Sequence, residues 1–113
     1  FHIPFCTKKC PYCHFYVIPN KKIFHSLLAD GLQREWDLRK NELASQKIVS
    51  VYFGGGTPSL FGPDPISRIL ERIQLDHNVE ITLEANPEES SKELFASYRS
   101  IGINRISLGV QSL

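Results

Sequence analysis

The stretch IVSVYFGGGTPSLFGPDPISRILERI, residues 48–73, contains the signals of a strand, a turn and a helix in succession. Its first six residues are β-branched or aromatic apart from one serine, which is typical of a strand. Three glycines and Pro58 then interrupt the pattern. Apolar residues recur at helical spacing after this interruption, at Ile66, Ile69, Leu70 and Ile73. We therefore expect a β–turn–α unit, with Asp64 as the N-cap and Pro65 as the first helical residue.

The chain upstream of this unit repeats the same alternation. Residues 1–5 are expected to be the end of a strand, and the loop that follows carries the cysteines and extends to Asn20. Between residues 21 and 45 apolar side chains recur at helical spacing; they are Phe24, Leu27, Leu28, Leu32 and Trp36. This spacing predicts a helix, and Asn20 is its expected N-cap.

The chain downstream continues in the same way. Residues 79–83 alternate between apolar and polar side chains and predict a third strand. Residues 94–101 predict a helix that ends near Gly102, and residues 105–110 predict a fourth strand. The complete order is β-α-β-α-β-α-β, which predicts an α/β fold with a parallel sheet and right-handed crossovers.

Two architectures satisfy this order, an open doubly wound sheet and a closed (β/α) barrel, and the pattern alone does not separate them. A barrel takes roughly 250 residues, so a chain of 113 residues would supply about half of one. No repeat or low-complexity linker divides residues 1–113, which are expected to form one unit. The absence of methionine and the end of the chain after a strand-like run favour a chain truncated at both ends.

Special or polar residues follow each predicted strand. The cysteines follow the first strand and the glycine run follows the second, while Glu84 and Gln111 end the third and the fourth. Because parallel α/β folds place their sites at the carboxyl ends of strands, these four features should converge on one surface. The sequence therefore predicts a single active site at this edge of the sheet.

The three cysteines, Cys6, Cys10 and Cys13, form a C-x3-C-x2-C motif within eight residues. An odd, tightly clustered set is a poor disulfide framework, and soft thiolates at this spacing suit zinc or an iron–sulfur cluster. A structural zinc would require a fourth ligand, which His14 or His2 could supply. The remaining alternative is that the cysteines simply pack as small apolar residues.

The composition excludes several classes of partner. Thirteen basic and twelve acidic side chains leave a net charge of +1, which gives no electrostatic footprint for nucleic acid. No apolar run approaches the roughly 20 residues that a membrane-spanning helix requires. The first residues do not have the pattern of a signal peptide, and clustered cysteines fit a reducing cytoplasmic setting.

Four motifs together resemble one known family. They are HIPFC-x3-CPYC at residues 2–13, VYFGGGTPS at 51–59, LEANPEE at 83–89 and INRISLGVQSL at 103–113. In this order they resemble the oxygen-independent coproporphyrinogen III oxidase family of radical S-adenosylmethionine (SAM) proteins, and the resemblance covers almost the whole chain. It implies that residues 1–113 are the N-terminal part of a radical SAM core domain, a partial (β/α) barrel.

The resemblance also implies roles for individual residues. Cys6, Cys10 and Cys13 match the ligands of a [4Fe-4S] cluster that leaves one iron free for SAM. Electron transfer from the reduced cluster would cleave SAM to methionine and a 5'-deoxyadenosyl radical. The positions that match SAM contacts in the family are Tyr12, Gly55, Gly56, Thr57, Glu84 and Gln111.

One position separates the branches of this family. Dehydrogenases of the family carry a further cysteine where this chain has Phe15, which favours the HemW-like branch of haem chaperones. His14 stands where that branch usually has aspartate. The resemblance therefore implies a haem-handling protein with SAM, porphyrinogen or haem, and an electron donor as partners. The alternatives are a true coproporphyrinogen III dehydrogenase and, in another class, a non-enzymatic zinc-stabilised binding module.

Overall fold

A parallel sheet of four strands forms the centre of the structure, a computed structural model that describes residues 1–7, 11–14 and 16–110. The strands, in their order across the sheet, are β1 (His2–Ile3), β4 (Ser50–Gly55), β5 (Glu80–Ala85) and β6 (Arg105–Leu108). Neighbouring strands are parallel, so that Val51 of β4 lies opposite Ile81 of β5. The predicted α/β fold with a parallel sheet is confirmed.

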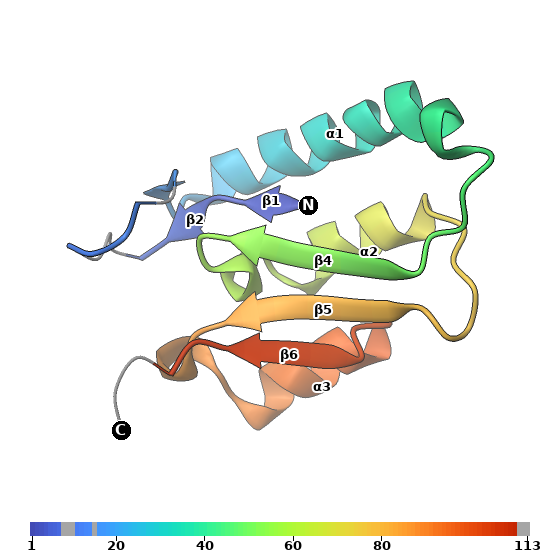
Figure 1. Ribbon diagram of the computed structural model, residues 1–113. Helices are drawn as coiled ribbons and strands as arrows, with labels where there is room; N and C mark the ends of the chain where they lie inside the picture. Colours follow the sequence, from blue (N-terminus) through green and yellow to red (C-terminus); the bar gives the residue numbers. More distant parts are fainter. Residues whose placement is uncertain (8–10, 15, 111–113) are drawn as a thin grey trace.

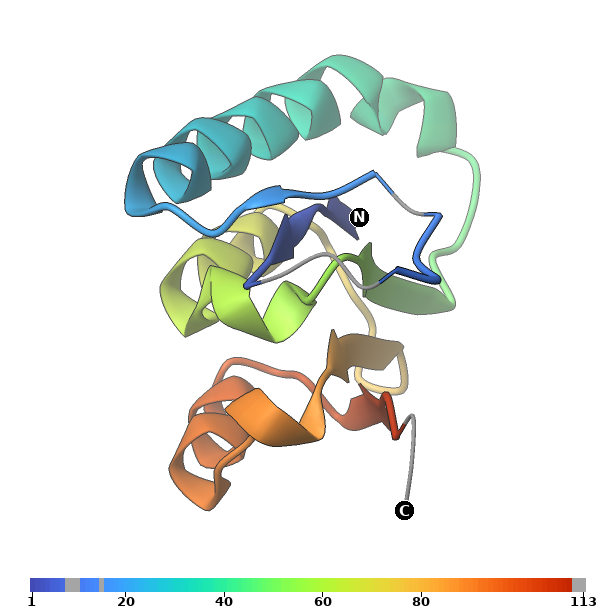
Figure 2. The same ribbon diagram turned by 90° about the vertical axis from the view of Figure 1, so that its left-hand side faces the viewer.

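The helices leave one face of this sheet open. The helices α2 (Pro63–Glu71) and α3 (Lys92–Ser100) connect β4 to β5 and β5 to β6, and both lie on the same face (Figures 1 and 2). The helix α1 (Lys22–Arg39) runs along the β1 edge and packs against α2. Within the described ranges, no helix covers the opposite face. Doubly wound sheets carry helices on both faces, so this arrangement is that of a (β/α) barrel segment.

Short elements gather at the carboxyl end of the sheet. Two of them, β2 (Phe5–Cys6) and β3 (Ile18–Pro19), pair in parallel on either side of the cysteine-bearing loop. The 3-10 turns η2 (Pro58–Phe61) and η3 (Pro87–Glu89) lie there too, whereas η1 (Lys40–Leu43) follows α1 and precedes β4, at the opposite end of the sheet. Both turns lie beside the loop that carries the cysteines, because η2 contacts β2 and Glu89 of η3 accepts a hydrogen bond from Thr7 Oγ1 at 3.4 Å.

Tyr98 connects the core to η2. Its side chain is fully buried between α3 and the sheet, among apolar residues such as Phe53, Ile66, Ile69 and Leu83. The hydroxyl donates to the carbonyl oxygen of Ser59 at 2.7 Å and accepts from the N–H of Gly62 at 3.1 Å. Burial raises the pKa of Tyr98 to about 12, so the phenol remains protonated and able to donate.

The helix α1 begins at Lys22, one residue later than the expected N-cap, Asn20, would place its first residue. The N-cap of α1 is Lys21, and no side chain caps this end of the helix. The prediction of Asn20 as N-cap is wrong because its Oδ1 atom is instead bonded to Nε2 of His25. The helix also ends at Arg39, with η1 continuing to Leu43, rather than at residue 45. None of the helices in the described ranges is both long and apolar enough to cross a membrane.

The second helix begins two residues earlier than predicted. Its N-cap is Gly62, whose φ of 92° turns the chain into the helix, and Pro63 is the first helical residue. Asp64 and Pro65 therefore lie inside the first turn, and their assignment as N-cap and first residue is wrong. Pro63 suits its position because the N–H it lacks would have no partner inside the helix.

The bounds of β4 and β5 lie closer to the carboxyl end of the sheet than predicted, whereas β6 ends at Leu108 rather than at residue 110. β4 covers residues 50–55 rather than 48–53, because Gly54 and Gly55 pair with β1 whereas Val49 is 71% exposed. β5 similarly covers 80–85 rather than 79–83, which places Glu84 one residue before the strand end. The glycine run is therefore partly strand, and its backbone is fixed by the sheet.

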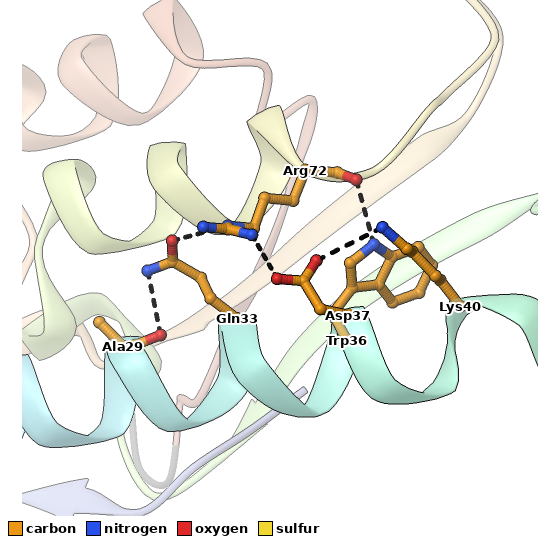
Figure 3. Close-up of polar contacts among 6 residues, drawn as sticks. All are labelled: Ala29, Gln33, Trp36, Asp37, Lys40 and Arg72. Carbon is orange, nitrogen blue, oxygen red and sulfur yellow. Dashed lines mark hydrogen bonds and ion pairs between the residues drawn. The ribbon is translucent and has the colours of Figure 1, made fainter.

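A polar network holds α2 against α1 (Figure 3). The guanidinium of Arg72, at the end of α2, donates to Gln33 Oε1 at 2.9 Å and forms an ion pair with Asp37. The carbonyl oxygen of Arg72 accepts from Trp36 Nε1 at 3.0 Å. Lys40 adds a longer ion pair to Asp37, at 3.7 Å. Arg72 is thus the residue through which α1 contacts the end of α2 by hydrogen bonds.

Replacing Arg72 by alanine should lower the free energy of unfolding by about 1–2 kcal/mol, because two side-chain hydrogen bonds to α1 are lost. The matched control is Lys40→Ala, which removes only a longer, exposed ion pair and should change stability by less than about 0.5 kcal/mol. Urea denaturation of both variants measures the difference. Equal effects would show that Arg72 adds no more than an exposed ion pair does.

Candidate functional site

Thr57 lies where three strand ends meet. Its backbone N–H donates to the carbonyl oxygen of Phe5 at 2.6 Å, which ties the end of the glycine run to the segment before the first cysteine. Its Oγ1 atom is 3.6 Å from Sγ of Cys6 and 3.1 Å from Nδ2 of Asn86, which follows β5. The side chain is only 3% exposed. The structure therefore brings the cysteine loop, the glycine run and the end of β5 to one point.

Glu84 is held by two donors from β4. Gly55 N donates to Glu84 Oε2 at 3.1 Å, and the hydroxyl of Tyr52 donates to Glu84 Oε1 at 2.6 Å. The hydrogen bond to this carboxylate is the largest cause that raises the pKa of Tyr52, followed by desolvation. Each carboxylate oxygen has a second lone pair available to a further donor. Glu84 is thus oriented at the open face of the sheet, next to the glycine run.

Tyr52 did not emerge from the sequence as a site residue. The signal that could have found it is the register of the parallel sheet, which places Tyr52 opposite Thr82. Side chains two residues apart in a strand share a face, so Tyr52 and Glu84 point to the same side of the sheet. Without knowledge of the pairing, an aromatic residue inside a strand is indistinguishable from a core residue.

The glycines allow two backbone segments to approach closely. A Cβ atom at Gly56 would lie 2.6 Å from the carbonyl oxygen of Phe5 and 2.8 Å from the carbonyl carbon of Pro4. Gly55 has a φ of 121°, and a Cβ there would lie 2.7 Å from the ring of His2. The N–H of Gly56 donates to the carbonyl oxygen of Ile3 at 2.8 Å. The glycine run is therefore required by contact with the segment before Cys6.

Replacing Gly56 by alanine should lower stability by more than about 2 kcal/mol, because the new methyl group meets backbone atoms that cannot rotate away. Gly31→Ala is the matched control, since a Cβ at this exposed position in α1 meets no atom within 4 Å. That change should stabilise the protein by about 0.5–1 kcal/mol. Urea denaturation compares the two, and a Gly56→Ala variant as stable as the parent would contradict this packing account.

Two of the three cysteines lie within the described ranges. Cys6 and Cys13 are both half-buried free thiols, and Cys10 lies outside these ranges. Among the described residues, no three His, Cys, Asp or Glu side chains are grouped so that they could hold a metal ion, and neither His2 nor His14 completes such a set. Free thiols on a loop at the carboxyl edge of the sheet nevertheless suit a soft centre, because an all-sulfur set is what iron–sulfur clusters use.

Four of the six residues expected to contact SAM lie close together, whereas Tyr12 is exposed and Gln111 lies outside the described ranges. Tyr12 is 62% exposed and lies on the cysteine loop. Gln111 and Phe15 lie outside the described ranges. Gly55, Gly56, Thr57 and Glu84 lie close together through the contacts above.

An aromatic cluster supports the start of the cysteine loop. Phe5 is fully buried, with its ring centroid 4.3 Å from that of His25 and 5.7 Å from that of Phe61. Asn20 Oδ1 is hydrogen-bonded to Nε2 of the same imidazole. Desolvation is the larger influence on His25 and lowers its pKa, while a hydrogen bond with the backbone of Phe61 opposes that shift. His25 thus anchors residue 5, directly before Cys6.

The chain is similar over almost its whole length to proteins of one known superfamily. The model of the radical SAM superfamily matches residues 1–113. "Heme chaperone HemW" of Haemophilus influenzae is 43% identical over 121 aligned positions, which cover 98% of this chain and 31% of that protein. "Radical S-adenosyl methionine domain-containing protein 1, mitochondrial" of Danio rerio is 38% identical, with 99% of this chain and 26% of that protein covered.

A solved structure shows the same arrangement of elements. Coproporphyrinogen III oxidase (HemN) from Escherichia coli, described as a radical SAM enzyme, superposes with a TM-score of 0.87 at 31% identity. The alignment covers 99% of this chain and 27% of that one, and the chain spans about a third or less of each relative's length. With a family model that matches its whole length, the chain belongs to the radical SAM superfamily, and its relatives there are the HemW and HemN proteins.

Proposed function

We propose that Cys6, Cys10 and Cys13 hold a [4Fe-4S] cluster and that the adjoining strand ends bind SAM. Members of the radical SAM superfamily in general use both cofactors. The observation that carries the proposal is the meeting of Cys6 with the glycine run at the buried Thr57. The residues proposed to contact SAM are Tyr12, Gly55, Gly56, Thr57, Glu84 and Gln111. When bound, the cluster would supply the electron for reductive cleavage of SAM.

Glu84 has the clearest role among these residues. A ribose presents hydroxyl donors, and an ionised carboxylate with free lone pairs is a strong acceptor for them. The N–H of Gly55 and the hydroxyl of Tyr52 hold the carboxylate in place before any ligand arrives. Such preorganisation lowers the entropic cost of binding. Tyr52 therefore acts on SAM through Glu84 and is a positioning residue.

Glu84→Gln should weaken SAM binding about tenfold, because a hydrogen bond to a charged acceptor becomes one to a neutral amide. Tyr52→Phe should weaken it about threefold to fivefold, since Glu84 loses one of its two fixed donors. Isothermal titration of the anaerobically reconstituted intact protein measures both. Tyr16→Phe is the matched control, because the Tyr16 side chain is 71% exposed. Unchanged affinity in Glu84→Gln would rule out the assignment of Glu84 to SAM.

We further propose that the intact protein handles haem in the manner of its HemW relatives, in the cytosol and with an electron donor. The support is their identity of 36–43% and the phenylalanine at position 15, where dehydrogenases of the family have a further cysteine. The second candidate is coproporphyrinogen III dehydrogenation, which the superposition on HemN supports. In both cases residues 1–113 would be part of a radical SAM core domain.

The two candidates differ in what the intact protein does with porphyrins. Haem titration followed by absorbance should show saturable binding, and incubation with coproporphyrinogen III, SAM and dithionite should leave the substrate unchanged. A product that has lost two carboxyl groups as carbon dioxide would establish the dehydrogenase instead. Failure to bind haem would remove the chaperone proposal.

A further inference from the structure

We propose that Thr57 donates a hydrogen bond to the thiolate of Cys6 and thereby raises the reduction potential of the cluster, with Asn86 as the positioning residue that directs the hydroxyl proton. This inference rests on the proposed function, because it assigns a task to residues around the same cluster. It concerns the electronic tuning of the centre, which is separate from the binding of SAM.

The donors and acceptors around Thr57 determine which atom its hydroxyl proton faces. The side-chain N–H group of Asn86 can only donate, and it reaches Thr57 Oγ1 at 3.1 Å. The hydroxyl of Thr57 then accepts from Asn86 and retains its single proton for another acceptor. The sulfur of Cys6 lies 3.6 Å from the same oxygen, within hydrogen-bond reach for a large acceptor such as sulfur. Asn86 therefore selects the rotamer in which the proton points at Cys6.

Three backbone contacts hold this chain of groups in place. The N–H of Thr57 donates to Phe5 O at 2.6 Å, and its carbonyl oxygen accepts from Leu60 N at 3.0 Å. The carbonyl oxygen of Asn86 accepts from the hydroxyl of Ser90 at 2.6 Å. Thr57 is 3% exposed, so water does not compete for its proton and the bond acts in a medium of low dielectric constant. The donor is fixed before the cluster changes its charge.

A fixed donor at a cluster sulfur favours the reduced form. One-electron reduction takes [4Fe-4S]2+ to [4Fe-4S]1+, and the added negative charge spreads onto the thiolate ligands. Hydrogen bonds to the sulfurs stabilise that charge and are one of the factors that set cluster potentials. Removing the proton of Thr57 should therefore make the cluster harder to reduce.

The test is a redox titration of the anaerobically reconstituted intact protein without SAM, with dithionite as the electron source and the reduced cluster followed by electron paramagnetic resonance. Thr57→Val, which keeps the shape and loses the hydroxyl, should reduce the equilibrium constant for reduction about threefold to tenfold. At 59 mV per tenfold for one electron, this is a fall of about 30–60 mV. Thr57→Ser, which keeps the hydroxyl, is the matched control and should remain near the parent potential.

Asn86→Ala tests whether Asn86 acts by orienting the Thr57 hydroxyl or whether its loss disturbs the site in general. It should lower the potential in the parent and have no further effect in the Thr57→Val background, because its action passes through Thr57. An unchanged potential in Thr57→Val with a full cluster overturns the inference. If Thr57→Val holds no cluster, Asn86→Ala decides, since a fall in potential supports the inference and an unchanged potential overturns it. A parent protein that forms no [4Fe-4S] cluster would instead contradict the proposed function itself.

Discussion

The contact between residues 3–5 and the glycine run is the constraint on which the rest of the site depends. Two backbone hydrogen bonds join these segments, from Gly56 N to Ile3 O and from Thr57 N to Phe5 O. They form only because Gly56 has no side chain, as a Cβ there would meet the backbone of residues 4 and 5. Cys6 follows at once, so the same contact places its sulfur against Thr57. This backbone contact thus determines both the packing of the two segments and the position of Cys6. The aromatic cluster around Phe5 supports it.

The face of the sheet that the described helices leave open forms the surroundings of this backbone contact. α2 and α3 cover the face that carries Val51, Phe53 and Leu83, and the other face is lined by polar side chains. That face holds the Tyr52–Glu84 pair near the glycine run and the Arg105–Glu80 pair further along the strands. In a (β/α) barrel the face away from the helices points to the interior. The groups that we propose to bind SAM thus lie at the mouth of an interior with polar walls.

The order of elements and the parallel sheet followed from hydrophobic periodicity, because the strands and helices of this chain are strongly patterned. The helix starts did not, because Asn20 is bonded to His25 and Pro63 suits the first helical position better than Pro65. Cysteine spacing and the glycine run pointed to the site region, whereas Tyr52 and Asn86 required the strand pairing. Local patterns predict the strands and helices, and only the tertiary structure shows which side chains meet across strands.

We propose that this chain provides the ligands of a cluster with one iron open to SAM. Electron paramagnetic resonance of the anaerobically reconstituted, dithionite-reduced intact protein, recorded with and without SAM, tests it most directly. We expect a [4Fe-4S]1+ signal whose shape changes when SAM is added, and we expect the signal to be lost when Cys6, Cys10 or Cys13 is replaced by alanine. A cluster signal indifferent to SAM would mean that a fourth protein ligand closes the site. Bound zinc with no sulfide would show that the three cysteines hold zinc and not an iron–sulfur cluster.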